Sequence, residues 1–334
     1  MTDASPVPPS FAMADVQAKR PTHRRAVAVG ELAAGARVFP LIVARRLPKG
    51  DALLLAEIAG IQGAKQAASL IPLCHPLPLD LVRLRTQPLP ETQAIRVYCE
   101  VATEARTGVE MEALAGVSAG LLTLYDLCKP VEPALAIGAI RLLFKEGGKR
   151  GLWLHPDGIS EDERAHYRPR ALARLDGIAA AVLTLSDRAS SGVYQDRAGP
   201  LLVESLRELG AAPIHAELLA DGIEPLATRL RELSGAGVKL CLCSGGTGLG
   251  PRDHTPEALA MVADRHIEGI GAMFRSESRH HTELAWLSRA SAVLVGGMLV
   301  IALPGSPRAV AQGMDILAPI LAHALAMMRG AGHA

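Results

Sequence analysis

Residues 244–253 read Ser-Gly-Gly-Thr-Gly-Leu-Gly-Pro-Arg-Asp, and they follow an apolar run, 238–243, that predicts a buried strand. The four glycines let the backbone turn sharply and approach a ligand closely, and successive free N–H groups in such a loop form a nest for an anion. Thr255 and Pro256 then predict a helix start, as N-cap and first helical residue. Strand, glycine loop and helix start together predict a phosphate site.

The same stretch narrows the chemistry of that site. No Gly-Lys-Ser/Thr follows the glycines, which excludes the P-loop of nucleoside triphosphatases. Asp253 places a carboxylate beside the phosphate nest, and a bound metal ion is the usual way to reconcile two such groups. The alternative is that Asp253 only caps the following turn.

The second half of the chain alternates strand and helix patterns, which predicts an α/β, doubly wound, mostly parallel sheet covered on both faces. The predicted strands are 178–185, 213–219, 238–243 and 292–303, and the predicted helices are 198–209, 224–233, 256–262, 271–288 and 306–328. Ligands in such folds bind beyond the carboxyl ends of the strands. Three loops there carry chemistry: 186–188, the glycine loop and 303–307.

The first half has a different pattern. Helical spacing runs over 51–70 and 108–129, whereas 94–106 alternates like a half-buried strand and 136–144 is strand-like. Two helices and several antiparallel-type strands predict an α+β fold, a ferredoxin-like open sheet with helices.

The length of the chain limits the number of domains that it can form. A chain of 334 residues predicts about two domains, and no repeat relates its halves. A polar, turn-rich stretch marks the seam between them, with a short helix possible within 164–174. We therefore expect a disordered tail (1–12), a first domain (13–151), a linker that mostly connects (152–176) and a second domain (177–330).

Composition also excludes several classes of protein. Aromatic residues make up 3% and the net charge is +1, which argues against nucleic-acid binding. No apolar stretch reaches the roughly 18 residues of a membrane span, and residues 1–10 lack the apolar core of a signal peptide. Five scattered cysteines form no disulfide framework, and Cys241 and Cys243 are expected to be packing residues. A reducing cytoplasm is the expected location.

Charged residues of the first half cluster at the ends of its elements. Taken singly, each has a structural explanation: His75 as a satisfied core histidine, Glu110 and Glu112 as partners of a helix dipole, and Asp126 with Lys129 as a surface i,i+3 pair. Together, lysines, a histidine and paired carboxylates suit an anionic substrate that needs proton transfers.

The spacing of two carboxylates adds a geometric inference. Glu112 and Asp126 are 14 residues apart, so they share one helix face but lie about 21 Å apart along the axis. One small substrate cannot touch both within one subunit. Either they serve different tasks, or, as we favour, the site is assembled from two chains.

With these residues in view, 13–151 resembles cyclic pyranopterin monophosphate synthase, the MoaC family of molybdenum cofactor biosynthesis. The matching stretches are 13–19, 49–51, 59–65, 70–77, 107–114 and 125–129. The resemblance implies conversion of 3′,8-cyclo-7,8-dihydro-GTP to cyclic pyranopterin monophosphate with release of pyrophosphate. It implies that Asp126, Lys129 and Lys49 are catalytic, that Leu73, Cys74, His75, Met111, Glu112 and Glu110 contact substrate, and that Lys65, Lys145 and Arg106 hold the triphosphate. A lysine held near another cation has a depressed pKa and can move protons near neutrality.

Residues 178–328 resemble the MogA/MoaB molybdopterin-binding family. The matching stretches are 185–196, 245–248, 250–257, 287–290 and 303–307, with Ser244 and His254 as mild departures from the common pattern. The resemblance implies a molybdopterin adenylyltransferase that uses Mg²⁺ with ATP and has no permanently bound cofactor. It implies that Asp221 and Asp253 are catalytic and hold the metal, and that Ser186, Asp187, Gly245, Gly246, Thr247, Gly248 and Gly305 bind substrate.

Two alternatives remain for the second half. In place of a transferase, the first alternative is a non-catalytic molybdopterin carrier or oligomerisation module, and the second is a molybdate-inserting enzyme. A pure carrier has less need of two metal-holding aspartates, which favours the transferase. The families resembled favour trimers and hexamers, so a homo-oligomer is expected.

Overall fold

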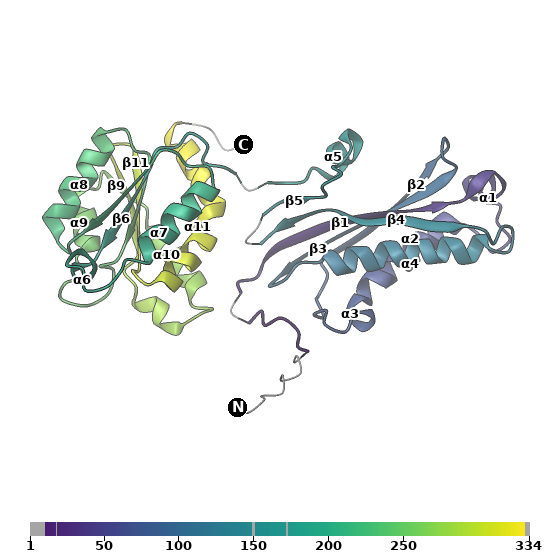
Figure 1. The fold of residues 1–334 in the computed structure, drawn as a ribbon, viewed down its shortest axis with the longest axis horizontal. Coiled ribbons are helices and arrows are strands. Elements are labelled where there is room, and N and C mark those ends of the chain that lie inside the picture. Colours follow the sequence, from purple (N-terminus) through teal and green to yellow (C-terminus); the bar gives the residue numbers. More distant parts are fainter. Residues whose placement is uncertain (1–10, 18, 149–150, 172, 331–334) are drawn as a thin grey trace, which may run out of the picture. The chain divides into compact units, whose positions relative to one another are not determined.

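The computed structural model describes residues 11–17, 19–148, 151–171 and 173–330. It divides the chain into two compact units, 1–171 and 172–334 (Figure 1). The mixed α and β content predicted for both halves is confirmed. Most of the predicted N-terminal tail, residues 1–10, lies outside the described residues.

The first unit is an antiparallel sheet of five strands in the order β2-β3-β1-β4-β5. The strands are β1 (Thr22–Ala33), β2 (Leu81–Leu89), β3 (Ala94–Ala105), β4 (Ala136–Gly147) and β5 (Trp153–Leu154). The helices are α1 (Gly35–Val43), α2 (Ala52–Lys65), α3 (Ala67–Leu70), α4 (Glu110–Cys128) and α5 (Glu161–Tyr167). Figure 1 shows α2 and α4 side by side on one face of this sheet, where their apolar residues form a common core with β1 and β3.

Small residues let α2 and α4 pack closely. A Cβ on Gly63 would lie 2.3 Å from the Cβ of Ala119, and one on Gly60 would lie 3.0 Å from the carbonyl oxygen of Gly116. The α2 helix begins where predicted, because the Asp51 side chain accepts a hydrogen bond from the Leu54 N–H (3.2 Å). It ends at Lys65 rather than continuing to residue 70 as predicted.

The segment 151–171, which we call the strap, was expected to be mostly a connection, and that expectation is wrong. Its β5 strand pairs with β4, and its α5 helix begins with a capping box between Ser160 and Glu163. The Tyr98 hydroxyl donates to Glu163 (2.9 Å), and Arg25 Nη2 donates to the carbonyl of Tyr167 (2.7 Å). Tyr167 is 4% exposed and packs in a core on the sheet face opposite α2 and α4.

The second unit has a six-stranded sheet in the order β7-β6-β8-β11-β10-β9. The strands are β6 (Ala180–Leu185), β7 (Ile214–Leu219), β8 (Leu240–Ser244), β9 (Arg265–His266), β10 (Ser291–Val295) and β11 (Met298–Leu303). The pairs β6/β7, β6/β8 and β8/β11 are parallel, which confirms the mostly parallel sheet. The single strand predicted over 292–303 is wrong: β10 and β11 form an antiparallel hairpin that turns at Gly296 and Gly297, both with positive φ.

Helices cover both faces of this sheet. They are α6 (Asp187–Ser190), α7 (Ala198–Glu208), α8 (Ile223–Gly235), α9 (Thr255–Val262), α10 (Glu268–Ser278), the 3₁₀ helix η1 (Glu283–Leu287) and α11 (Pro307–Met328). One core joins α7, α10 and α11 to the sheet, and a second core, which includes Cys241 and Cys243, joins α8 and α9 to the opposite face. The predicted helix 271–288 is wrong in length, because α10 stops at Ser278.

Within the part of the chain that the structure describes, two helices are long and apolar enough to span a membrane by length and composition alone, α4 with 19 residues and α11 with 22. Sequence reading gave no such segment. In the structure, 56% of the α4 window and 39% of the α11 window are buried. Both helices contribute to the cores already described, which is the ordinary reason for a long apolar helix.

The position of the strap predicts where the two units separate. A fragment that ends at Ala171 retains Tyr167, whereas one that ends at Gly151 exposes Tyr98 and Phe144. Loss of one large buried aromatic side chain typically costs about 3–5 kcal/mol of unfolding free energy. We expect the shorter fragment to unfold at a clearly lower urea concentration, measured by far-UV circular dichroism. Equal midpoints for the two fragments would show that the strap does not stabilise the first unit.

A second pair of fragments tests the boundary of the second unit in the same way. Leu175 is 1% exposed in the core of the second unit, and its N–H donates to the carbonyl of Leu209 (2.7 Å). A fragment that begins at 172 should therefore unfold at a higher urea concentration than one that begins at 177, the domain boundary expected from sequence.

Candidate functional site

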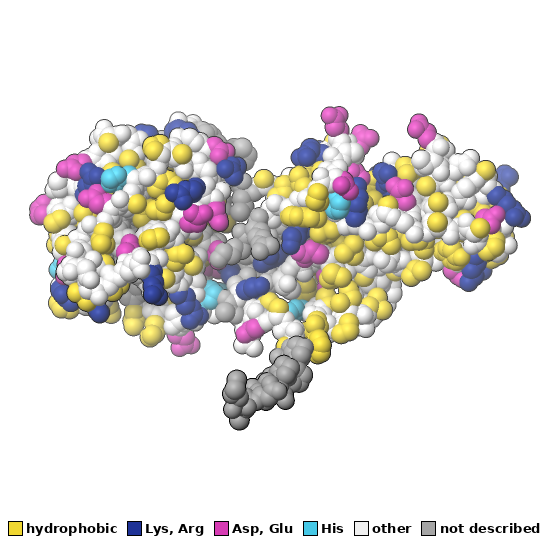
Figure 2. Space-filling view, in the orientation of Figure 1, with side chains coloured by type: hydrophobic (Ala, Val, Ile, Leu, Met, Phe, Trp, Pro, Cys, Tyr) yellow, Lys and Arg dark blue, Asp and Glu magenta, His cyan; other side chains and the backbone are white. Residues whose placement is uncertain are grey.

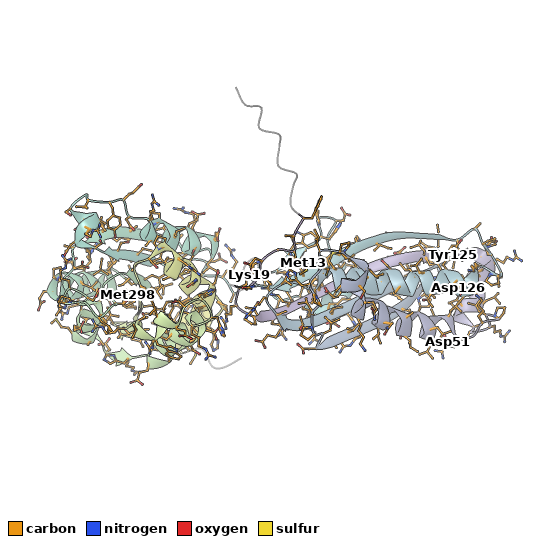
Figure 3. All side chains as sticks on the ribbon, turned by 90° about the horizontal axis from the view of Figure 1, so that it is seen from below. Met13, Lys19, Asp51, Tyr125, Asp126 and Met298 are labelled. Carbon is orange, nitrogen blue, oxygen red and sulfur yellow. The ribbon has the colours of Figure 1, made fainter. Side chains whose placement is uncertain are left out.

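The first charged cluster of the first unit lies at the C-terminal end of α4. Asp126 stands between two lysines: Lys129 Nζ lies 2.7 Å from its Oδ1, and Lys49 Nζ lies 3.0 Å from its Oδ2. Lys49 also donates to the Asp126 carbonyl (3.1 Å) from the loop before α2. Figure 3 shows Asp126, Tyr125 and Asp51 together at one end of this unit. The structure thus brings together the three residues predicted to be catalytic.

The electrostatics of this cluster differ from the sequence expectation. The hydrogen bond from Lys129, followed by that from Lys49, lowers the pKa of Asp126. The Asp126 carboxylate in turn raises the pKa of Lys129, so the depressed lysine pKa that we expected is wrong in this structure. The reason is that the carboxylate separates the two cations and outweighs their mutual repulsion.

The second cluster lies at the N-terminal end of α4. Glu112 is 3% exposed, its Oε1 lies 3.7 Å from Sγ of Cys74, and its Oε2 has no hydrogen-bond partner among the described residues. Burial raises the pKa of Glu112, and burial together with the Glu112 charge raises that of Cys74. A buried carboxylate with an unpaired oxygen is suited to receive a hydrogen bond or a proton from a ligand.

Basic residues surround the same end of α4. Lys145 Nζ lies 2.6 Å from Oε1 of Glu110. Arg24, which sequence reasoning missed, is half-buried, and burial lowers its pKa while the charge of Glu110 raises it. Its guanidinium lies against Gly148, which has positive φ. A Cβ on Gly148 would clash with the Arg24 guanidinium. The sequence signal that could have identified Arg24 is the alternation of side chains along β1, which points Arg24 and Arg25 to opposite faces of the sheet.

The remaining predicted residues of the first unit are less constrained. His75 Nε2 lies 2.9 Å from the carbonyl oxygen of Ala14, so the imidazole ties down the N-terminal segment. Four other predicted contacts are exposed at the surface: Leu73, Met111, Lys65 and Arg106. The two clusters are not joined, because Glu112 and Asp126 lie at opposite ends of α4, about 21 Å apart.

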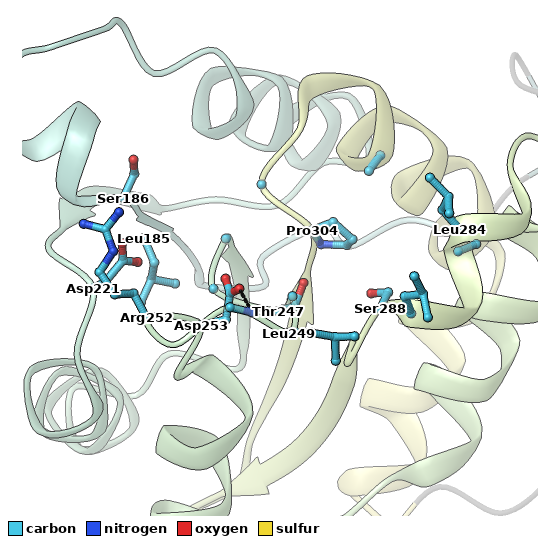
Figure 4. A pocket seen from close by; sticks show the side chains of 18 of the residues that line it. Leu185, Ser186, Asp221, Thr247, Leu249, Arg252, Asp253, Leu284, Ser288 and Pro304 are labelled. Carbon is cyan, nitrogen blue, oxygen red and sulfur yellow. Dashed lines mark hydrogen bonds between the residues drawn. The ribbon is translucent and has the colours of Figure 1, made fainter.

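The second unit contains a pocket of about 820 Å³ at the carboxyl ends of β6, β8 and β11 (Figure 4). It is lined by the predicted residues Ser186, Asp221, Gly245, Gly246, Thr247, Gly248, Asp253 and Gly305. Lining residues that sequence reasoning missed include Tyr194, whose hydroxyl lies 3.1 Å from Ser186 Oγ, and the apolar Leu249 and Leu284. Such side chains are what a flat, partly apolar ligand requires.

The glycine loop is held in a conformation that requires glycine. Gly245 and Gly246 have φ of 111° and 63°, and a Cβ on Gly245 would lie 2.2 Å from the carbonyl oxygen of Leu185. The predicted N-cap role of Thr255 is wrong. It is the first residue of α9, and its hydroxyl donates to the carbonyl of Gly245 (2.8 Å) instead.

Arg289 fixes the other half of the loop. Its Nε donates to the carbonyl of Gly248 (2.8 Å), its backbone N–H donates to the carbonyl of Thr247 (2.9 Å), and its guanidinium also bonds the Asp253 carbonyl and Glu257. Sequence reasoning placed Arg289 in a family motif without a role. Because three side-chain contacts and one backbone contact are made by this one residue, Arg289 is the main positioning residue of the loop.

Among the described residues, each of the two predicted metal-holding aspartates accepts hydrogen bonds through one carboxylate oxygen only. Asp253 Oδ2 accepts from the Gly250 N–H (2.8 Å), and Asp221 Oδ2 accepts from the Asp187 N–H (3.1 Å). Asp187 accepts in return from the Asp221 N–H (3.0 Å) and is a positioning residue rather than part of the pocket lining. No group of three or more metal-ligating side chains occurs among the described residues. Mg²⁺ is usually held by one or two carboxylates together with substrate phosphates, so this pair fits that ion.

Comparison with known proteins covers both units. The MoaC family model matches residues 13–148, and the model of the probable molybdopterin binding domain matches 181–323. The "Molybdenum cofactor biosynthesis bifunctional protein" of Synechococcus elongatus is 44% identical over 321 residues, 96% of this chain and 98% of that protein. The protein of the same description from Chlorobaculum tepidum is 37% identical over 322 residues, 96% of each chain.

Shorter relatives match one unit each. The "Cyclic pyranopterin monophosphate synthase" of Nostoc is 46% identical over 144 residues, 43% of this chain and 86% of that protein. The solved structure of the molybdopterin biosynthesis Mog protein from Mycobacterium ulcerans is 35% identical, covers 46% of this chain and 99% of its own, and gives a TM-score of 0.44.

Proposed function

Because this chain belongs to the family of molybdenum cofactor biosynthesis bifunctional proteins, we propose that its two units catalyse two separate reactions. The first unit converts 3′,8-cyclo-7,8-dihydro-GTP to cyclic pyranopterin monophosphate and pyrophosphate. The second transfers an adenylyl group from ATP to molybdopterin. One of its relatives over the first unit alone bears the name of the first activity.

The cluster of Lys49, Asp126 and Lys129 supports the first proposal most directly. Asp126 keeps the ammonium group of Lys129 charged, so Lys129 can donate a proton, and Asp126 can accept one when substrate displaces a lysine. Lys145 and Arg24, at the other end of α4, would hold the anionic phosphates. Glu112, buried and partly unpaired, would contact the ring system.

We further propose that the first site is assembled from two copies of the chain. The two clusters are too far apart for one small substrate. The helix layer also exposes apolar side chains that a second copy would cover, since Leu54 is 55%, Ile58 55% and Leu122 62% exposed. Figure 2 shows hydrophobic side chains gathered on this unit. A homo-oligomer, trimeric or hexameric, would satisfy both observations.

Three further properties belong to this proposal: the fold class of the first unit, the location of the protein in the cell and the kind of substrate. The order β1-α2-β2-β3-α4-β4, with β3 between β1 and β2, supports assignment of the first unit to the ferredoxin-like class. The five cysteines are all free, which supports a cytoplasmic location. The near-neutral charge supports small-molecule substrates rather than nucleic acid.

The pocket of the second unit supports the adenylyltransferase proposal. Backbone N–H groups of the glycine loop would hold phosphate oxygens, and Arg252, which lines the pocket, would add positive charge. Mg²⁺, held by Asp221 and Asp253, would neutralise the phosphates and polarise the one under attack. The loop, fixed by Arg289, would orient the phosphates without reorganisation. A carrier or a molybdate-inserting enzyme would use the pocket without this metal-dependent step.

A lysine substitution tests the first reaction. We expect Lys129→Ala to abolish formation of cyclic pyranopterin monophosphate, with turnover reduced by about a thousandfold or more, because general acid–base groups contribute up to about 10⁴-fold. Adenylyl transfer by the second unit of the same preparation serves as the internal control. Near-normal turnover of the first substrate would rule out a catalytic role for Lys129.

An aspartate substitution tests the second reaction. Asp253→Asn should leave pterin binding largely intact and remove Mg²⁺-dependent adenylyl transfer, and Asp221→Asn should do the same. The matched control is Asp264→Asn, because Asp264 also accepts from a glycine N–H (Gly296, 2.6 Å) but does not line the pocket. Adenylation by Asp253→Asn at the wild-type rate would reject the metal site and favour a carrier.

A further inference from the structure

The strap lies outside both family models, which end at residue 148 and begin at residue 181. Its β5 strand nevertheless extends the sheet beside the second cluster of the first unit. In the β4–β5 pair, Trp153 lies opposite Lys145 and Leu154 lies opposite Phe144. Residues directly opposite each other in an antiparallel pair share one face of the sheet.

The two faces of β5 have different surroundings. Leu154 packs with Phe144 in the core on the outer face of the sheet. Lys145 is paired on its other side with Ala26, which belongs to the core beneath α2 and α4, and its Nζ reaches Glu110 at the start of α4. Trp153 therefore lies on the helix side of the sheet, next to Lys145.

Trp153 is both accessible and held in place. It is 38% exposed, and the ring of His155 meets it edge-on with the centroids 6.0 Å apart. His155 is itself fixed. Its backbone N–H donates to the carbonyl of Leu143 (3.0 Å), and its imidazole Nδ1 accepts from the backbone N–H of Asp157 (3.2 Å). A chain with only two tryptophans thus places one of them, with a supporting histidine, beside a predicted phosphate-holding lysine.

We infer that the strap completes the anion site of the first unit, with Trp153 contacting the phosphate chain of the bound nucleotide-derived substrate. The indole N–H donates to a phosphate oxygen, and the ring shields the Lys145 ammonium group from water, which strengthens its hold on the phosphates. His155 is a positioning residue for the indole. This inference rests on the proposed role of Lys145 in holding the triphosphate.

Fluorescence of the full-length protein tests the contact. In a Trp286→Phe background, Trp153 is the only tryptophan, and inorganic triphosphate serves as the probe. We expect a saturable change in its emission that disappears in Lys145→Ala. Calorimetric binding that depends on Lys145 without any change in emission would overturn the inference and leave the proposed function standing. Absence of Lys145-dependent binding would instead reject the proposed phosphate site, and this inference with it.

Kinetics separate a binding role from a structural one. Trp153→Leu should raise the KM for the cyclic nucleotide substrate on the order of tenfold, the loss of one hydrogen bond to a charged group, with little change in kcat. Leu154→Val, on the opposite face of the same strand, should lower the melting temperature and leave KM unchanged. An unaltered KM in Trp153→Leu, or equal effects of both variants on KM, would contradict the contact.

Discussion

The length of α4 is the constraint on which the first unit depends. An α-helix rises 1.5 Å per residue, so a rigid helix of 19 residues keeps the pair Asp126–Lys129 at one end and the pair Glu110–Glu112 at the other. The close contact with α2, through Gly60 and Gly63, holds the middle of α4 against α2. The proposed catalytic and phosphate-holding groups are thereby separated within one chain, and this separation is the physical reason for proposing a site shared between copies.

In the second unit, by contrast, predicted site residues from distant parts of the sequence line one pocket. Gly245 donates its N–H to the carbonyl of Leu303 and lies against the carbonyl of Leu185, so three strand ends converge on a residue without a side chain. Arg289 also holds the glycine loop, because its Nε donates a hydrogen bond to the carbonyl of Gly248. This arrangement places backbone donors and two carboxylates around one pocket, and the proposed group transfer would use such preorganised charges.

Features with a local signal could be predicted from the sequence, and features made by distant contacts could not. The parallel sheet, the glycine loop and the start of α2 follow from apolar periodicity, glycine spacing and one capping aspartate. The hairpin at Gly296 was hidden inside an apolar run that reads as a single strand. The strap is polar in sequence and depends on contacts such as that of Arg25 with Tyr167, 142 residues away. The hydrogen bond from Arg289 to the carbonyl of Gly248, 41 residues away, leaves no local pattern in the sequence either. The raised pKa of Lys129 depends on the position of the Asp126 carboxylate, whose Oδ1 lies 2.7 Å from the Lys129 ammonium group.

Subunit mixing tests whether the site of the first unit is shared between two copies of the chain. Glu112→Gln and Lys129→Ala each damage one end of α4, so each protein alone should fail to form cyclic pyranopterin monophosphate. If each site takes its two ends from different chains, unfolding and reassembling the two variants together restores one intact site in every mixed pair. We expect recovery of roughly a quarter of wild-type activity, since about half of the pairs are mixed and each has one intact site of two. A mixture that stays as inactive as its two components would show that the site lies within one chain.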